Sequence, residues 1–143
     1  TNKYCNLNLS KDELSKIAIK IGADVPFFVY EYDSANVTGI GEIVEKFDEE
    51  MLNIDTITPN IKCNTGEIFK VFRENFYKQI SKNEADKLFK MKSIEILNNL
   101  NINEANDLYE PAISVYPKLE EYAQNSWFFS GSGSSFFKVN NVK

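Results

Sequence analysis

Apolar residues recur at helical spacing near the start of the chain, and polar residues mark the point where this helix begins. The apolar positions are Leu14, Ile17, Ala18 and Ile21. Ser10 and Glu13 have the spacing of a capping box, in which two side chains accept the first free amides of a helix. The pattern predicts a helix from about Lys11 to Ile21 that ends at Gly22, since glycine favours helix termination.

A continuous apolar run follows, without alternation of polar and apolar residues, from Val25 to Tyr30. Such a run is typical of a strand that is covered on both faces. Pro26 near its start suits an edge or an entry position, because proline cannot donate to a strand partner. We therefore predict a strand from Val25 to about Tyr32. A hairpin is predicted next, from Ala35 to Phe47, around the glycines of Gly39-Ile40-Gly41.

The later part of the chain combines short apolar runs with capped helical patterns. Strands are predicted at 52–58, 127–129 and 136–139. One helix is predicted after a cap at Asn64 or Thr65, with Glu67 reaching back to the helix start. Two further helices are predicted at 82–99 and 107–122. This order of elements predicts an α+β fold, in which an antiparallel sheet is covered by helices.

The composition narrows the classes of function that are open to this chain. It has 143 residues, a hydrophobic fraction of 43% and a net charge of -5, which excludes a general basic surface for nucleic acid. The absence of histidine excludes Ser-His-Asp and Cys-His nucleophile systems and histidine metal sites in it. Cys5 and Cys63 are too far apart for a zinc ribbon and are expected to be reduced thiols. The longest apolar run is far below the roughly 18 residues of a membrane span, so a soluble cytoplasmic protein is predicted.

One carboxylate, Asp24, lies between a glycine break and the apolar run. An ionised Asp in apolar surroundings loses solvation that a partner charge, a hydrogen bond or a ligand must replace, which makes Asp24 a candidate for chemistry. The alternative is that Asp24 caps a turn, since Asp favours turns and helix starts. Both interpretations stay open on this residue alone.

A second motif, Ser130-Gly131-Ser132-Gly133-Ser134-Ser135, lies between two pairs of aromatic residues. Such a segment can permit a tight backbone crossing or present amide N–H groups to an anion. Together with the segment Ile21–Val29, it resembles the GHMP kinase superfamily of small-molecule kinases. The resemblance extends to Gly39-Ile40-Gly41-Glu42 and to the segment Asn106–Ala112. It is strongest for the branch that phosphorylates a cytidine diphosphate derivative in non-mevalonate isoprenoid biosynthesis.

This resemblance implies an ATP-dependent kinase with Mg²⁺ as a further cofactor, a cytidine diphosphate derivative as substrate, and neither nucleic acid nor membrane as partner. Asp24 corresponds to the catalytic aspartate, which accepts the proton of a C2 hydroxyl as that oxygen attacks the γ-phosphate of ATP. Thr65 corresponds to a substrate hydroxyl contact, and Phe69 to an aromatic ring stacked on cytosine. Gly131, Ser132 and Gly133 match a motif near the diphosphate.

The resemblance also implies a division of the chain. Residues 1–47 are expected to be the tail of an N-terminal α/β domain that includes the Asp motif, and residues 48–143 a ferredoxin-like C-terminal domain. The glycine-rich phosphate loop and the N-terminal lysine of the family have no match here. We therefore expect this chain, which starts at Thr1, to be the later part of a longer protein and to lack kinase activity alone.

Two alternatives stay open at this point. The first is another kinase of the same superfamily, of the homoserine or mevalonate type. The second is a non-catalytic ligand-binding module, in which Asp24 is structural and the glycine-serine segment is only a backbone crossing.

Overall fold

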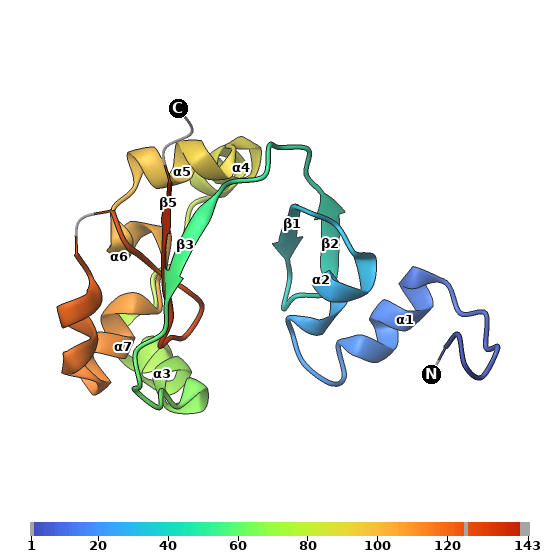
Figure 1. Cartoon of the computed structure of the whole chain (residues 1–143), viewed down its shortest axis with the longest axis horizontal. Coiled ribbons are helices and arrows are strands. Elements are labelled where there is room, and N and C mark those ends of the chain that lie inside the picture. The colour runs from blue at the N-terminus through green and yellow to red at the C-terminus, as the bar shows by residue number, and fades with distance from the viewer. Residues whose placement is uncertain (1, 125, 141–143) are drawn as a thin grey trace. The chain divides into compact units, whose positions relative to one another are not determined.

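The computed structural model describes residues 2–124 and 126–140, and the contacts divide the chain into two compact units, Thr1–Met51 and Leu52–Lys143 (Figure 1). Strand pairing is antiparallel in both units, which confirms the predicted α+β class. The ends of the two predicted domains, residues 1 and 143, lie outside the described residues. The assignment of 1–47 and 48–143 to two kinase domains stays a prediction.

The first unit begins with helix α1, Lys11–Ala18, and its predicted capping box is confirmed. The backbone N–H of Ser10 donates to Glu13 Oε2 at 2.8 Å, and the backbone N–H of Glu13 donates to Ser10 Oγ at 3.3 Å. The helix ends before the predicted Ile21 because its last turn tightens. The amides of residues 20 and 21 bond to carbonyls three residues back, which is the 3₁₀ pattern.

The capping box of α1 predicts a pH dependence. The backbone amide of Ser10, and then its hydroxyl, stabilise the charged carboxylate and lower the pKa of Glu13 below its ordinary value. A group whose pKa is lowered by folding stabilises the fold above its unfolded-state pKa, and this contribution is lost as the pH falls through the folded-state pKa. We therefore expect Ser10→Ala to raise the pKa of Glu13 toward its ordinary value, as measured by an NMR titration of the carboxyl carbon.

The control for this titration is a second capping box in the other unit. Hydrogen bonds from Ser81 lower the pKa of Glu84 in the same way, and Ser10→Ala leaves those bonds intact. The titration of Glu84 should therefore be the same in both proteins. An unchanged pKa of Glu13 in the variant would contradict the prediction.

The apolar run forms a helix, α2, Val25–Tyr30, so the predicted strand from Val25 to Tyr32 is wrong. A short apolar run lacks the periodicity that separates a strand from a helix. Pro26 lies in the first turn of α2, where a helix needs no amide donor, and Glu31 ends the helix in the left-handed region at φ 56°. The expected cover on both faces is also absent, because Phe28 is 70% exposed.

The predicted hairpin is confirmed. Strand β1, Ala35–Thr38, pairs with β2, Ile43–Lys46, in antiparallel register. In the connecting turn, the backbone N–H of Ile40 donates to Glu42 Oε2 at 2.6 Å. Strand β2 contacts α2, and α1 packs on α2, so the helices and the hairpin form one compact unit.

The second unit is built on a sheet of three described strands in the order β3-β5-β4. These are β3, Ile54–Ile57; β4, Phe128–Phe129; and β5, Phe136–Val139. Both pairings are antiparallel, and the register places Ile57 and Phe129 opposite Phe136. The first and last strands of this unit are therefore neighbours, and β5 is the centre of the sheet.

The helices of the second unit follow β3 in the chain and precede β4. They are α3, Thr65–Val71; α4, Lys82–Lys90; α5, Ser93–Asn99; α6, Ile102–Ala105; and α7, Tyr109–Val115. A π-helical turn, Phe72–Phe76, continues α3, and a 3₁₀ helix, Pro117–Tyr122, follows α7.

Two of the predicted helices are each divided in the structure. The helix predicted at 82–99 is interrupted at 91–92, where the backbone is extended, and α5 then begins with a backbone amide bond to the Glu95 carboxylate at 2.8 Å. The helix predicted at 107–122 stops before Pro117, because proline disfavours a helical backbone in the residue that precedes it.

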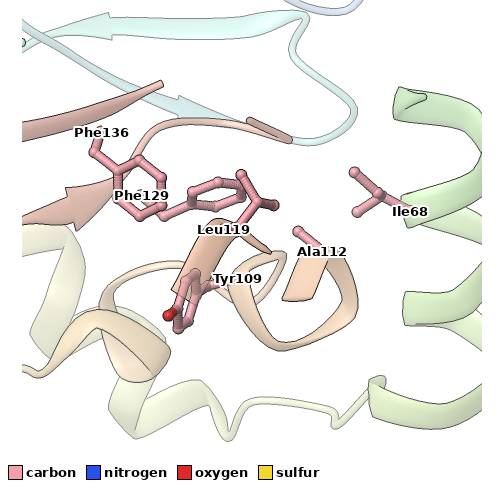
Figure 2. Close-up of a cluster of buried hydrophobic side chains, with 6 residues drawn as sticks. All are labelled: Ile68, Tyr109, Ala112, Leu119, Phe129 and Phe136. Atoms are coloured by element: carbon pink, nitrogen blue, oxygen red, sulfur yellow. The ribbon is translucent and has the colours of Figure 1, made fainter. Parts of the chain in front are cut away.

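The core of the second unit is a cluster of buried side chains (Figure 2). Its members are Ile68, Tyr109, Ala112, Leu119, Phe129 and Phe136. They come from α3, α7, the 3₁₀ helix and the strands β4 and β5, so these helices cover one face of the sheet. The ring of Phe136 meets the ring of Phe129 edge to face, with 5.2 Å between the ring centroids.

Candidate functional site

The glycine-serine loop, residues 130–135, connects β4 to β5 and is closed by its own backbone. The N–H of Ser130 donates to the carbonyl of Ser135 at 2.9 Å, and the N–H of Gly133 donates to the carbonyl of Ser130 at 3.0 Å. Gly131 and Gly133 have φ angles of 55° and 87°, in the left-handed region that other residues rarely adopt. The tight turn therefore depends on glycine at both positions.

The two glycines of the loop differ in the space around them, and this difference predicts a stability effect. A Cβ on Gly133 would lie 2.5 Å from Cζ of Phe129, whereas a Cβ on Gly131 would meet nothing within 4 Å. Alanine at either position adds the left-handed strain of about 1–2 kcal/mol. Gly133→Ala also overpacks the core, so it should cost about 1–3 kcal/mol more than Gly131→Ala in urea unfolding. Equal losses for the two variants would contradict the prediction.

Thr65 and Ser132, two residues predicted to contact substrate, are brought together by the fold. Their hydroxyl oxygens are 2.8 Å apart and hydrogen-bonded, although the residues are 67 positions apart in the chain. Thr65 is the first residue of α3, and Asn64 caps this helix by accepting the N–H of Glu67 at 3.1 Å. Phe69 lies one helical turn further along α3 and is 39% exposed. The start of α3 and the glycine-serine loop thus form one polar surface with an exposed aromatic ring beside it.

Two more hydroxyls of the loop bond to the segment that leads into α3. Ser134 Oγ donates to the carbonyl of Pro59 at 2.8 Å, and Ser135 Oγ lies 2.8 Å from Thr58 Oγ1. The segment 58–65 therefore holds the loop at three hydroxyl contacts, at Ser132, Ser134 and Ser135. This arrangement fixes the position of the loop relative to the start of α3.

Tyr116 is a residue of this site that the sequence did not reveal. Its hydroxyl accepts the N–H of Asn64 at 3.1 Å and donates to Glu67 Oε2 at 3.0 Å. The expectation that Glu67 reaches back to the helix start is therefore wrong, because its carboxylate bonds the tyrosine hydroxyl instead. Tyr116 follows α7, and it was one aromatic residue within a helical pattern, which gave no signal of this role.

Asp24 belongs to the first unit, where it is the N-cap residue of α2. It is exposed, and its side chain makes no capping hydrogen bond. The expected loss of solvation in apolar surroundings is therefore wrong for this residue. The tip of the hairpin lies against the preceding residue, since a Cβ on Gly41 would collide with the carbonyl oxygen of Ala23. Within the described residues, no hydrogen bond or ion pair engages the Asp24 carboxylate, so both of its oxygens are open to a ligand.

Two ionisable side chains of the second unit have a pKa that is raised by burial. Burial raises the pKa of the Cys63 thiol, whose sulfur would lie 3.2 Å from a Cβ on Gly133. Burial also raises the pKa of the Tyr109 hydroxyl in the core.

Residues 2–124 and 126–140 contain no group of three or more Cys, Asp or Glu side chains that could hold a metal ion. Over the same residues, no helix is long and apolar enough to cross a membrane.

Comparison with curated proteins finds relatives among small-molecule kinases. The chain is 46% identical over 138 residues to a 4-diphosphocytidyl-2-C-methyl-D-erythritol kinase of Sulfurimonas denitrificans, covering 96% of this chain and 52% of that protein. It is 44% identical to the same kinase of Sulfurovum sp., covering 92% and 52%, and 36% identical to that of Helicobacter pylori, covering 99% and 53%. The chain spans about half the length of the curated relatives it matches.

Comparison with solved structures finds a kinase of the same description with a similar fold. The chain is similar to the crystal structure of a 4-(cytidine 5'-diphospho)-2C-methyl-D-erythritol kinase, with a TM-score of 0.61 and 24% sequence identity. The match covers 92% of this chain and 48% of that chain. No family model matches the sequence.

Proposed function

The chain is a homologue of 4-diphosphocytidyl-2-C-methyl-D-erythritol kinases over about half of their length, and from this premise we propose that it is the C-terminal, substrate-side part of such an enzyme. The proposed reaction is ATP-dependent phosphorylation of the C2 hydroxyl of 4-diphosphocytidyl-2-C-methyl-D-erythritol, a step of non-mevalonate isoprenoid biosynthesis. The observation that supports it most directly is the 46% identity to a curated kinase over 96% of this chain.

Asp24 is the base in the proposed reaction. The C2 hydroxyl oxygen forms a bond to the γ-phosphorus while the bond from that phosphorus to the bridging oxygen of ADP breaks, and the hydroxyl proton passes to the Asp24 carboxylate. Phosphoryl transfer needs mainly positioning and charge stabilisation, so one carboxylate is enough acid–base apparatus for a chain without histidine. Its exposure and the absence of a capping hydrogen bond from its side chain, among the residues that the structure describes, support this role.

The second unit supplies the substrate contacts in this proposal. The joined hydroxyls of Thr65 and Ser132 offer both a donor and an acceptor to the substrate. The exposed ring of Phe69 offers a face on which cytosine can stack. The backbone of Gly131, Ser132 and Gly133 lies beside the diphosphate. The mutual position of Thr65 and the loop supports this assignment, since the two predicted contacts fall on one surface.

ATP is the phosphoryl donor that homology to a kinase implies, and Mg²⁺ is proposed as its companion. In kinases, Mg²⁺ bridges phosphate oxygens and neutralises charge during transfer. The described residues of this chain offer no group of acidic side chains that fits a resident metal, so we assign to Mg²⁺ no residue here and no step.

The two units correspond, in this proposal, to the two domains of the kinase. Residues 1–47 are the tail of the N-terminal α/β domain with the catalytic aspartate, and residues 48–143 are a ferredoxin-like C-terminal domain. The antiparallel β3-β5-β4 sheet with helices on one face supports the second assignment. The N-terminal half of the same polypeptide is the partner that the proposal requires, and a cytoplasmic location is part of it.

The experiment that tests the proposed function is an ATP-dependent phosphorylation assay. The protein with its natural N-terminal extension restored is offered 4-diphosphocytidyl-2-C-methyl-D-erythritol, homoserine and mevalonate in parallel. We expect product from the first substrate only, and no product from the 143-residue chain without the extension. Product from homoserine or mevalonate alone would assign another kinase of the superfamily. Binding of the cytidine substrate without turnover by the extended protein would favour a binding module.

A further inference from the structure

Asn106 uses its whole side-chain amide to join three parts of the second unit. Its Nδ2 donates to the carbonyl of Phe129 and to the carbonyl of Gly131, both at 2.9 Å. Its Oδ1 accepts the N–H of Leu108 at 2.9 Å. Both donor hydrogens therefore point at the glycine-serine loop and the end of β4, while the acceptor holds the start of α7.

The backbone of Asn106 is fixed as firmly as its side chain. Its N–H donates to the carbonyl of Ile102 in α6, and its carbonyl accepts the N–H of Tyr109 in α7. Tyr109 is 5% exposed, and its ring meets the ring of Phe129 with 5.5 Å between centroids. The amide that holds the loop is thus anchored to the hydrophobic core of the unit.

The bond to the Gly131 carbonyl determines the direction of the next amide. In a planar trans peptide the carbonyl and the following N–H point in opposite directions, so the N–H of Ser132 points away from Asn106. The peptide between Phe129 and Ser130 shows the same arrangement. Its carbonyl accepts a hydrogen bond from Asn106, while its N–H donates in the other direction, to the carbonyl of Ser135. Within the part of the chain that the structure describes, the Ser132 N–H has no hydrogen-bond partner. It is a donor that the loop presents and does not use.

We infer that Asn106 is a positioning residue, which orients the Ser132 N–H toward the anionic diphosphate of the substrate. This inference rests on the proposed function for the identity of the ligand. An N–H group donates to a phosphate oxygen without any change of protonation, and an ionised acceptor strengthens the bond. Asn106 itself contacts neither the substrate nor the reacting atoms. It acts on substrate binding through the glycine-serine loop, which it holds in place.

The first test compares kinetic constants of the kinase with its N-terminal extension restored. Asn106→Ala should raise KM for the cytidine diphosphate substrate on the order of tenfold, the loss of one hydrogen bond to a charged group. The KM for ATP should not change. Asn106→Asp keeps the shape of the side chain and the acceptor for the Leu108 N–H, but it loses both donors. It should therefore raise the same KM. This second variant keeps the inference testable if Asn106→Ala does not fold.

Matched controls separate positioning from simple structural support. Asn101→Ala removes the cap of α6, where Asn101 Oδ1 accepts two backbone amides, and should leave KM for the substrate unchanged. Asn103→Asp introduces the same charge as Asn106→Asp at an exposed position three residues away, and it should also leave that KM unchanged. A KM that is unchanged in both Asn106 variants, or raised equally in the controls, would overturn the inference while the proposed function stands.

The second test is independent of turnover and uses the 143-residue chain. Inorganic pyrophosphate is titrated while the amide signals of the loop are followed by NMR. We expect the Ser132 amide signal to shift in the wild-type chain and not in Asn106→Ala, and the Ser130 and Gly133 amides to exchange with solvent faster in the variant. Absence of a Ser132 shift in the wild-type chain, or unchanged exchange in the variant, would overturn the inference. A kinase that fails on the cytidine substrate while these signals respond as expected would overturn only the proposed function.

Discussion

Replacing Asp24 by Asn in the kinase with its N-terminal extension restored should lower kcat by about 10²–10⁴-fold, the contribution of a positioned general base. The amide has the shape of the carboxylate but cannot accept the hydroxyl proton. The substitution should not disturb folding, because Asp24 is exposed and its side chain makes no capping bond to α2. Steady-state rates of ATP-dependent phosphorylation at saturating substrate measure this effect.

The control for this variant is Asp33→Asn in the same unit, which removes an exposed carboxylate and the same formal charge. Its kcat should match that of the wild type. If Asp24→Asn retains the wild-type kcat, Asp24 is structural, and the assignment of the base in the proposed reaction is wrong. Comparable losses in both variants would point to net charge instead of proton transfer.

Truncating Phe136 to alanine should lower the free energy of unfolding of the second unit by about 3–5 kcal/mol. The side chain is completely buried in the central strand, and its ring lies against the rings of Phe129, Tyr109 and Tyr122. Removing it leaves a cavity that a sheet and three packed rings cannot easily fill. Urea unfolding followed by the fluorescence of Trp127, beside β4, measures the loss.

Phe137→Ala is the matched control for the truncation of Phe136. Phe137 is the next residue of β5 and is only partly buried, with its ring 5.8 Å from the ring of Phe128. Successive strand residues point to opposite faces of a sheet, so Phe137 lies outside the core cluster. Its truncation should cost clearly less than that of Phe136. Equal losses would mean that the cluster in Figure 2 is not the main source of stability in this unit.

Short-range signals in the sequence predicted their structures well. The Ser10 and Glu13 capping box and the hairpin from Ala35 to Phe47 are confirmed, and of the two predicted cap residues, Asn64 and Thr65, the structure has Asn64. The caps depend on residues three positions apart and the hairpin on one short turn, so all three are local properties of the chain. The last strand is also confirmed at Phe136–Val139.

The predictions that failed needed information from outside the segment concerned. The run from Val25 to Tyr30 has no periodicity, so its helix is decided by the proline in its first turn and by packing on α1. The hydroxyl of Tyr116 reaches Glu67, which is 49 positions away, and no local pattern encodes that contact. The same limit applies to the exposure of Asp24, which the residues next to it in the sequence do not determine.

The candidate site was predicted by resemblance more than by physical pattern. Residue chemistry alone left Asp24 and the glycine-serine loop with two readings each. The structure adds the bond between Thr65 and Ser132 and the two bonds of Asn106 to Phe129 and Gly131, which connect residues far apart in the chain. Such contacts cannot be read from spacing, because they arise only when distant segments pack together.

The central place of β5 has a consequence for the order in which this protein can be made. Strands β3 and β4 pair with β5 and not with each other, and β5 is the last of the three to be synthesised. A nascent chain on the ribosome that ends before Phe136 can form its helices but lacks the strand with which both β3 and β4 pair among the described residues. In such a chain, β5 does not yet hold the C-terminal end of the glycine-serine loop. The contacts of the loop with residues 58–65 therefore form only after β5 has emerged.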